Sequence, residues 1–597
     1  MKKNQNCNES GSLGDKAMKP ELKDGAEDLA PPYSQSRRSF IKSAGGVTAI
    51  TLAAGAVALE PFLGSESAKV KAGEVGPLNN SVRQSRAHQI RIDAANLAAS
   101  NRSSSQDHIS NVDEAAFPNK IGNFSKGLPH HSNGEVVVSA YNQLIRALTT
   151  GKPADFERIT MGCPDLTRRF KFINPQAGLA FDLEGDDGHK PFVPPANSIN
   201  SRKAAIDICE NYWMALLRDL PFEDYDSSTL AQEAAAELDG FGSDFMGPME
   251  GGHVTTNTLF RGNAAGCLNG PFVSQFLMRP APFGAQFVDQ RLKVPIPGND
   301  HLTSFNEYLV AQNGFLPAPL TLDQQYLPGR RYPITGRDLT AFVHIDVLFQ
   351  AYFNALLILQ APGDPDSTFG GVGCPLNSGN PYTNSLTQFG FGTFGPPGIQ
   401  ALLGEVASRA LKAQWFQKWY VHRRLRPENM GSLVHLTATN QQNYPIDGAI
   451  LNSQAVSKTF TKYGTGLLPQ AFPEGCPTHP SYGAGHATVA GACVTLLKAL
   501  FDEDFVITDP VMPTPDGSAL VPYVGPPLTV KGELHKLGFN IALGRNIGGV
   551  HWRSDALVSL PVGEQITISI LRDQRLTYNE TFAGYTFTKF DGTTITV

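Results

Sequence analysis

The chain of 597 residues carries 49 Lys and Arg against 55 Asp and Glu, a net charge of −6. With 41% hydrophobic and 17% charged residues, it is not an intrinsically disordered chain, and its acidic balance gives no reason to expect a nucleic-acid partner. Its 58 glycines and 43 prolines indicate long loops between elements.

The N-terminus has the layout of an export signal. Paired arginines, Arg37 and Arg38, precede an uncharged apolar stretch at 44–59, and the order of residues resembles a twin-arginine signal. We expect residues 1–67 to be this signal with its tail, cleaved near Ser67, and the mature protein to be periplasmic or secreted. A soluble tail or an uncleaved anchor is the alternative, although the stretch is short for a span, and no later stretch is long enough to cross a bilayer.

Residues 68–395 are predicted to form an N-terminal helical region. Its first part, 85–135, is polar and has no clean period. Apolar residues then recur at three- and four-residue spacing in 136–148 and 203–217, which predicts two amphipathic helices. Residues 342–359 are apolar nearly all round, which is typical of a core helix.

Two stretches of this region, 240–300 and 363–397, are rich in Gly and Pro and are predicted to be long loops. Loops of this length inside a helical protein usually shape a site or an interface. Seven cysteines are present without a CxxC pair, which argues against a zinc ribbon or a redox dithiol. After export, some of them could pair.

Residues 396–597 are predicted to form a C-terminal helical domain. A first helix runs from Ile399 to about Leu425, where Pro427 would end it. Further helices are expected at 485–501, 534–543 and 551–571 (the last bent at Pro561), and a terminal β-hairpin at 585–597. The expected fold is mainly α, with helical bundles, long Gly/Pro-rich loops and one small C-terminal hairpin.

The first candidate site segment lies at the end of that first helix. Lys418, His422 and Arg426 are spaced by four residues, so on a continuous helix they share one face. Their backbones would span roughly 12 Å, within reach of one ligand. By itself, the pattern is more often a solvated basic face.

The second segment contains His479 and runs to Gly485 and His486, where small residues open a helix. Free amides and the positive end of the helix dipole would face a ligand there, and His486 stands in the first turn, where it can exchange a proton. By itself, such a turn is more often explained by packing.

The third segment contains Arg545 at the end of one helix and His551 at the start of the next, with Asp555 four residues later. The carboxylate could hold one ring nitrogen of His551 and raise the basicity of the other. Taken together, the three segments supply a Lys, two Arg, helix-end amides and two His. That many cationic donors point to an anion, and a tetrahedral oxyanion such as phosphate or vanadate fits.

The order and spacing of the three segments resemble the vanadium-dependent haloperoxidases and their acid-phosphatase relatives. The seven-residue gap between Lys418 and Arg426, with the residues inside it, is most similar to the red-algal and bacterial bromoperoxidase branch. The resemblance covers the last third of the chain and implies a homo-oligomeric enzyme. It would use hydrogen peroxide to oxidise a halide to hypohalous acid, which halogenates a small organic acceptor.

The same resemblance implies roles for single residues. Lys418, Arg426, the Gly485 amide and Arg545 would donate to vanadate oxygens, and Lys418 would also polarise the bound peroxide. His551 would be the axial ligand to vanadium, and His486 the acid–base group.

Two further positions concern affinity and the choice of halide. Ala484 stands where the family usually has Ser. Loss of one hydrogen bond to a charged ligand, about 1.5–3 kcal/mol, would weaken vanadate binding roughly ten- to a hundredfold. His479 occupies the position that is His in bromoperoxidases and Phe in chloroperoxidases, which favours bromide, and Trp415 is compatible with either.

Two other functions are compatible with the same sequence pattern. A phosphatase would use the same oxyanion site, with His551 as the phosphoryl-accepting nucleophile. The small phosphatases lack several hundred upstream residues that this chain has. An exported anion-binding protein without activity is the other alternative, and the retention of both His486 and His551 argues against it.

Overall fold

The computed structural model describes residues 80–100, 108–315, 320, 322–363 and 371–597. The predicted export signal and Cys7 lie outside these residues. Residues 78–597 form one compact unit. In the part that the structure describes, no helix has the length and apolar character needed to cross a membrane.

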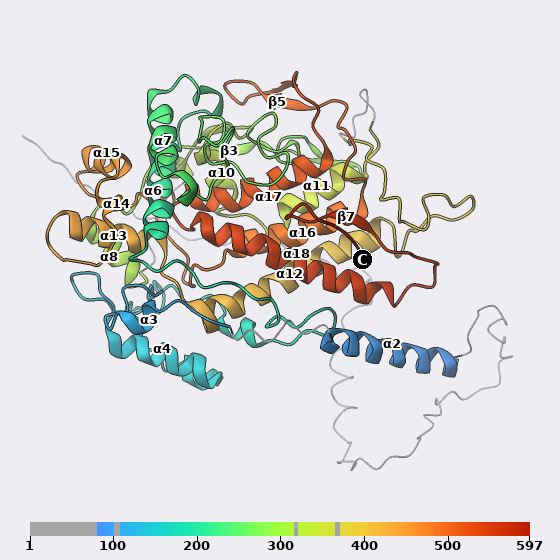
Figure 1. Cartoon of the computed structure of the whole chain (residues 1–597), viewed down its shortest axis with the longest axis horizontal. Helices are drawn as coiled ribbons and strands as arrows, with labels where there is room; N and C mark the ends of the chain where they lie inside the picture. The colour runs from blue at the N-terminus through green and yellow to red at the C-terminus, as the bar shows by residue number, and fades with distance from the viewer. Residues whose placement is uncertain (1–79, 101–107, 316–319, 321, 364–370) are drawn as a thin grey trace, which may run out of the picture. The chain divides into compact units, whose positions relative to one another are not determined.

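Most of the described chain is helical (Figure 1). The helices before the central loops are α2 (Asn80–Ser100), α3 (Asp113–Ala116), α4 (Val138–Thr150), α5 (Pro153–Phe156), α6 (Arg202–Leu217), α7 (Thr229–Asp239), α8 (Phe305–Gln312), α9 (Leu322–Gln325), α10 (Gly336–Phe342) and α11 (Gln350–Gln360). The later helices are α12 (Pro396–Phe416), α13 (Pro427–Ala438), α14 (Gly448–Leu451), α15 (Gln454–Tyr463), α16 (Gly485–Leu500), α17 (Val530–Ile547) and α18 (Arg553–Arg575). The mainly α prediction is confirmed, as are the helices expected at 136–148, 203–217 and 485–501.

The strands form only two-stranded antiparallel sheets. They pair β1 (Ala281–Phe283) with β2 (Gln286–Val288), β3 (Leu292–Pro295) with β4 (Tyr326–Arg331), β5 (Val511–Pro513) with β6 (Leu520–Pro522), and β7 (Thr586–Thr588) with β8 (Thr594–Thr596). The last pair is the predicted C-terminal hairpin.

Helices α12, α16, α17 and α18 form the centre of the fold and run side by side in Figure 1. Helix α16 is buried at nearly every position, which its Ala, Val and Leu content explains. Glycines allow close packing, because a Cβ at Gly491 of α16 would lie 2.0 Å from the backbone oxygen of Leu560 in α18. Pro561 lies inside α18, as predicted.

One upstream prediction is wrong. The helix predicted at 342–359 is broken, since α10 ends at Phe342 and α11 begins only at Gln350. Local hydropathy did not reveal the break, because residues 343–349 are themselves largely apolar. The polar stretch 85–135, which lacks a clean period, includes most of helix α2, and α2 has no buried residue.

The helix predicted to run to Leu425 also ends early. Helix α12 stops at Phe416 and continues as a π-helical turn, Gln417–His422 (η5), after which Arg423 adopts a left-handed conformation with φ 42°. Pro427 is the first residue of α13 rather than the end of α12, because proline is well tolerated where a helix amide has no intrahelical acceptor. The division into regions at residue 395 stays a prediction.

All six cysteines of the described chain are buried free thiols. The pairing considered from the sequence does not occur among them.

Candidate active site

Arg426 lies at the centre of the site, in extended backbone just before α13. Its guanidinium donates to the backbone oxygens of His479 at 2.9 Å and Val550 at 2.6 Å. Its Nη1 also lies 3.0 Å from Nε2 of His551. One side chain therefore connects all three sequence segments.

Lys418 reaches the same place from the π-helical turn. Its fully buried Nζ donates to the backbone oxygens of Pro480 at 3.0 Å and Ser481 at 2.8 Å, and it lies 5.8 Å from the ring centroid of Trp415. The cation therefore has neutral acceptors but no carboxylate in direct contact.

His422 does not join Lys418 and Arg426, so the prediction that the three share a helix face is wrong. The π-helical turn changes the angular spacing, and Arg426 lies beyond the helix. The His422 ring packs against Tyr482, and among the described residues neither ring nitrogen has a hydrogen-bond partner.

His551 is oriented by Asp555 from the first turn of α18. Its Nδ1 lies 2.7 Å from Oδ2 of Asp555. A carboxylate accepts hydrogen bonds, so Nδ1 carries the proton and Nε2 keeps its lone pair toward Arg426. Asp555 is held in turn by Nη1 of Arg424 at 2.9 Å and by Oγ of Ser481 at 2.5 Å.

His486 stands in the first turn of α16, and 22% of its side chain is exposed. Its Nε2 lies 3.1 Å from Oδ1 of Asp346, in the segment between α10 and α11. Gly485 begins the same helix, so its amide has no acceptor within the helix. The helix end and the imidazole can thus act on one ligand from the same side.

Arg545 approaches from the last turn of α17. Its Nη1 donates to the backbone oxygen of Val343 at 2.6 Å, and its guanidinium lies 5.4 Å from the centroid of Phe472. Among the described residues, its buried Nε has no hydrogen-bond partner.

The pKa values show how crowded these charges are. Burial, and next the charge of Arg426, lower the pKa of Lys418 well below its usual value, and the same causes lower the pKa of Arg545 to about 10. Burial also lowers the pKa of His551 strongly, with Arg426 and Lys418 adding to the effect. An anion among these groups would relieve the repulsion. We call Lys418, Arg426, Arg545, His551 and the Gly485 amide the oxyanion site.

The remaining predicted residues border this site. The rings of Trp415 and His479 lie 4.8 Å apart between centroids, and Nη2 of Arg426 lies 2.9 Å from Nδ1 of His479. Ala484 is the buried N-cap of α16 and has no capping side chain, while its amide donates to Oγ of Ser559 at 2.8 Å. The structure therefore brings together every predicted site residue except His422.

The sequence did not reveal three polar residues that support the site: Asp346, Arg424 and Ser481. Asp346 lies in a segment predicted to be helix, and it meets His486 only through the fold. Arg424 lies within the first candidate site segment and Ser481 within the second, but nothing in their spacing indicates that both bond Asp555.

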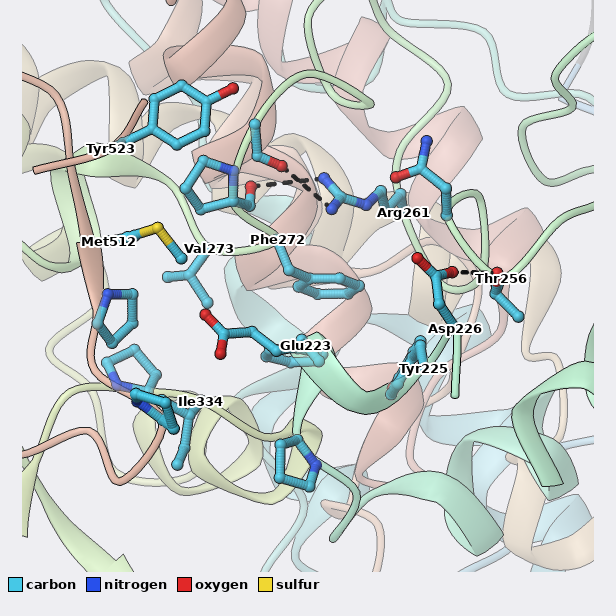
Figure 2. Close-up of a pocket in the computed structure, with 18 residues that line it drawn as sticks. Glu223, Tyr225, Asp226, Thr256, Arg261, Phe272, Val273, Ile334, Met512 and Tyr523 are labelled. Carbon is cyan, nitrogen blue, oxygen red and sulfur yellow. Dashed lines mark hydrogen bonds between the residues drawn. The ribbon is translucent and has the colours of Figure 1, made fainter. Parts of the chain in front are cut away.

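A cavity of about 320 Å³ lies elsewhere in the described part. Figure 2 shows Phe272, Val273, Met512 and Tyr523 around it, with the Arg261 guanidinium turned to backbone oxygens. No predicted site residue lines this cavity. Among the described residues, no group of three or more His, Cys, Asp or Glu side chains could hold a metal ion.

Comparisons with known proteins identify relatives of this chain. A family model described as VCPO second helical-bundle domain matches residues 400–578. The vanadium-dependent bromoperoxidase of Corallina officinalis is 36% identical over 81% of this chain and 92% of its own length. That of Ascophyllum nodosum is 34% identical over 79% of this chain and 86% of its own length.

A solved structure gives the same result for the fold. The homohexameric structure of the second vanadate-dependent bromoperoxidase of Ascophyllum nodosum superposes with a TM-score of 0.81 and 27% identity. The match covers 90% of this chain and 94% of that chain.

Proposed function

Because this chain belongs to the vanadium-dependent haloperoxidase family, we propose that its oxyanion site holds vanadate and oxidises bromide with hydrogen peroxide. The enzyme is a vanadium-dependent bromoperoxidase. One observation carries the proposal for the site: three buried cationic side chains lie around His551, whose Nδ1 is held by Asp555 and whose Nε2 faces Arg426 at 3.0 Å.

The donor set fits an oxyanion of this kind. Lys418, Arg426 and Arg545 are buried and have no carboxylate partner within ion-pair distance among the described residues. The Nε–H of Arg545 is unused there. Such groups are costly to bury unless an opposite charge accompanies them.

Each group has a separate task. Lys418, Arg426, Arg545 and the Gly485 amide would donate hydrogen bonds to vanadate oxygens, and Nε2 of His551 would bond the vanadium. When bound, vanadate supplies a Lewis-acidic centre that activates peroxide for attack by a halide. Asp555 keeps Nδ1 of His551 protonated, so the nitrogen facing the site stays a ligand rather than a donor.

His486 is the proton-transfer group of the proposal. Its Nε2 bonds Asp346, and its partial exposure lets it exchange protons with incoming peroxide and with solvent. His479 beside Arg426 supports bromide as the halide. The product, hypobromous acid, would then halogenate a small organic acceptor.

Export and assembly complete the proposal. The twin-arginine-like residues near Arg37 support export of a folded protein to the periplasm or beyond. The homohexameric structure of the similar bromoperoxidase supports a homo-oligomer.

One assay tests this function against a phosphatase. Purified protein is incubated with orthovanadate, peroxide and bromide, and bromination of a diketone is followed beside hydrolysis of a phosphate ester. We expect bromination that requires vanadate and is inhibited by phosphate. Hydrolysis without bromination would instead favour the phosphatase, with His551 as its nucleophile.

A further inference from the structure

A second cavity, of about 260 Å³, lies next to the oxyanion site. Lys293 of β3 and Tyr326 and Arg330 of β4 line one part of it. Phe342, Ile345 and Asp346, at and beyond the end of α10, line another. We call these six residues and the space between them the hairpin pocket.

The segment after α10 separates the hairpin pocket from the oxyanion site and contacts both. Asp346 lines the pocket and bonds Nε2 of His486 at 3.1 Å. Three residues earlier, the backbone oxygen of Val343 accepts from Arg545 at 2.6 Å. A molecule in the pocket is therefore one side chain away from the predicted acid–base group.

The charged side chains of the hairpin pocket indicate which kind of ligand it can bind. Lys293 Nζ lies 5.6 Å from the centroid of the Tyr326 ring, and Arg330 donates only to the backbone oxygen of Arg291, at 3.3 Å. Neither cation forms an ion pair with any residue that the structure describes. The single acidic residue of the hairpin pocket, Asp346, is already engaged by His486.

Apolar surface completes the pocket. Ile345 is 73% exposed, and Phe342 and Tyr326 are half-buried, so a flat ring can cover them. Aromatic rings gain most of their binding free energy from such contact area. Two free cations beside it match an anionic substituent.

We propose that the hairpin pocket binds the organic acceptor, as an aromatic carboxylate whose anionic group lies against Lys293 and Arg330. This inference rests on the proposed function, which supplies hypobromous acid from the adjoining site. A ring carbon attacks bromine, the C–Br bond forms and the O–Br bond breaks. The ring carbon is oxidised by two electrons, bromine passes from +1 to −1, and hydroxide leaves and combines with the displaced ring proton as water.

Binding is measured first, on vanadate-free protein, by calorimetric titration with 4-hydroxybenzoate and with the neutral 4-hydroxybenzamide. We expect the double variant K293Q/R330Q to bind the carboxylate about tenfold more weakly, since each ion pair at a solvent-accessible site contributes a few-fold. Its affinity for the amide should not change. Lys203→Gln, an exposed lysine on α6, is the matched control and should bind both probes like the wild type.

A competition experiment follows with the vanadate-loaded enzyme. The wild type should brominate 4-hydroxybenzoate in preference to the amide in an equimolar mixture, and K293Q/R330Q should lose that preference. Tribromide formation without any acceptor reports the oxyanion site alone. If wild-type enzyme forms no tribromide, the proposed function fails. If tribromide forms but the double variant binds and brominates the carboxylate like the wild type, the hairpin pocket is not the acceptor site.

Discussion

At the scale of single residues, Asp346 shows how the fold adds a group that no motif contains. It is the only carboxylate among the described residues that contacts His486. The distance of 3.1 Å between its Oδ1 and Nε2 of His486 orients the ring without blocking the exposed part of it.

Asp346→Asn removes this charge and keeps the side-chain size. We expect kcat for bromide oxidation to fall roughly tenfold, as for other residues that orient a reacting group, with little change in vanadate affinity. Steady-state kinetics and a vanadate titration measure the two effects. Asp323→Asn, at an exposed position of α9, is the control. Equal losses of kcat and vanadate affinity would show that Asp346 acts on the oxyanion site as a whole.

Ala484 stands at the position where the resemblance to the haloperoxidases leads us to expect a serine. A serine there would place a hydroxyl at the N-cap of α16, next to Gly485. We expect Ala484→Ser to tighten vanadate binding about tenfold or more, because a hydrogen bond to a charged ligand contributes about 1.5–3 kcal/mol. Equilibrium titration of the apoprotein measures it, with Ala401→Ser on the exposed face of α12 as the control. A raised Tm with an unchanged titration would mean that the hydroxyl caps the helix instead.

At the scale of elements, the route from Lys418 to Arg426 shows what a sequence pattern can and cannot predict. The motif correctly indicated that Lys418 and Arg426 lie near each other, but the shared helix face from which this was predicted does not exist. A spacing of four implies a shared helix face only if the helix is regular, and here a π-helical turn and the left-handed Arg423 intervene. Such irregularities depend on tertiary packing, which overrides local propensity. For the same reason, the break before Asp346 could not be predicted from hydropathy.

Close packing of α16 on α18 depends on glycine. We expect Gly491→Ala to destabilise the fold by about 1–3 kcal/mol, the usual cost of overpacking, because its Cβ would lie 2.0 Å from the Leu560 oxygen. Gly538→Ala in α17 is the matched control, since its Cβ would approach no atom more closely than Cγ2 of Val494, at an ordinary contact distance of 3.5 Å. Urea unfolding should separate the two variants, and equal midpoints would contradict this account of the helix crossing.

The carboxyl groups of Glu184 and Glu405 form a pair, and Glu405 lies on α12. Burial, and next the charge of Glu405, raise the pKa of Glu184 to about 7, and Gln574 donates to it at 2.5 Å. A group with a raised pKa in the folded state contributes stability that is present below its unfolded pKa and is lost as pH rises through about 7.

Glu184→Gln should remove this part of the pH dependence. We expect the Tm of the wild type to fall more than that of Glu184→Gln between pH 5 and pH 8, as measured by calorimetry at constant ionic strength. Glu405→Gln should behave similarly, because it removes the other member of the pair. Parallel curves for all three proteins would show that the pair does not titrate in this range.

At the scale of the whole molecule, the oxyanion site holds an uncompensated positive charge inside the main helical core. Lys418 and Arg426 are buried between α12 and α13, and Arg545 is buried on α17. Burial lowers the pKa of each. The burial of these three positive charges therefore opposes folding. A bound oxyanion should stabilise the entire fold and not only the segments that touch it.

Orthovanadate should accordingly raise the Tm of the protein in proportion to the logarithm of its concentration. At a hundredfold excess over Kd, the gain in free energy of unfolding is about 2.7 kcal/mol, which calorimetry resolves as a shift of a few degrees. Orthovanadate should shift the Tm of Lys418→Gln less than that of the wild type, because a hydrogen-bond donor and a positive charge are lost. Without vanadate, the Tm of Lys418→Gln should fall less than that of a typical buried substitution, since the variant also removes the repulsion between Lys418 and Arg426. If orthovanadate shifted the Tm of Lys418→Gln as much as that of the wild type, the stabilising anion would be bound elsewhere, because no ligand can stabilise a fold through a group it does not contact.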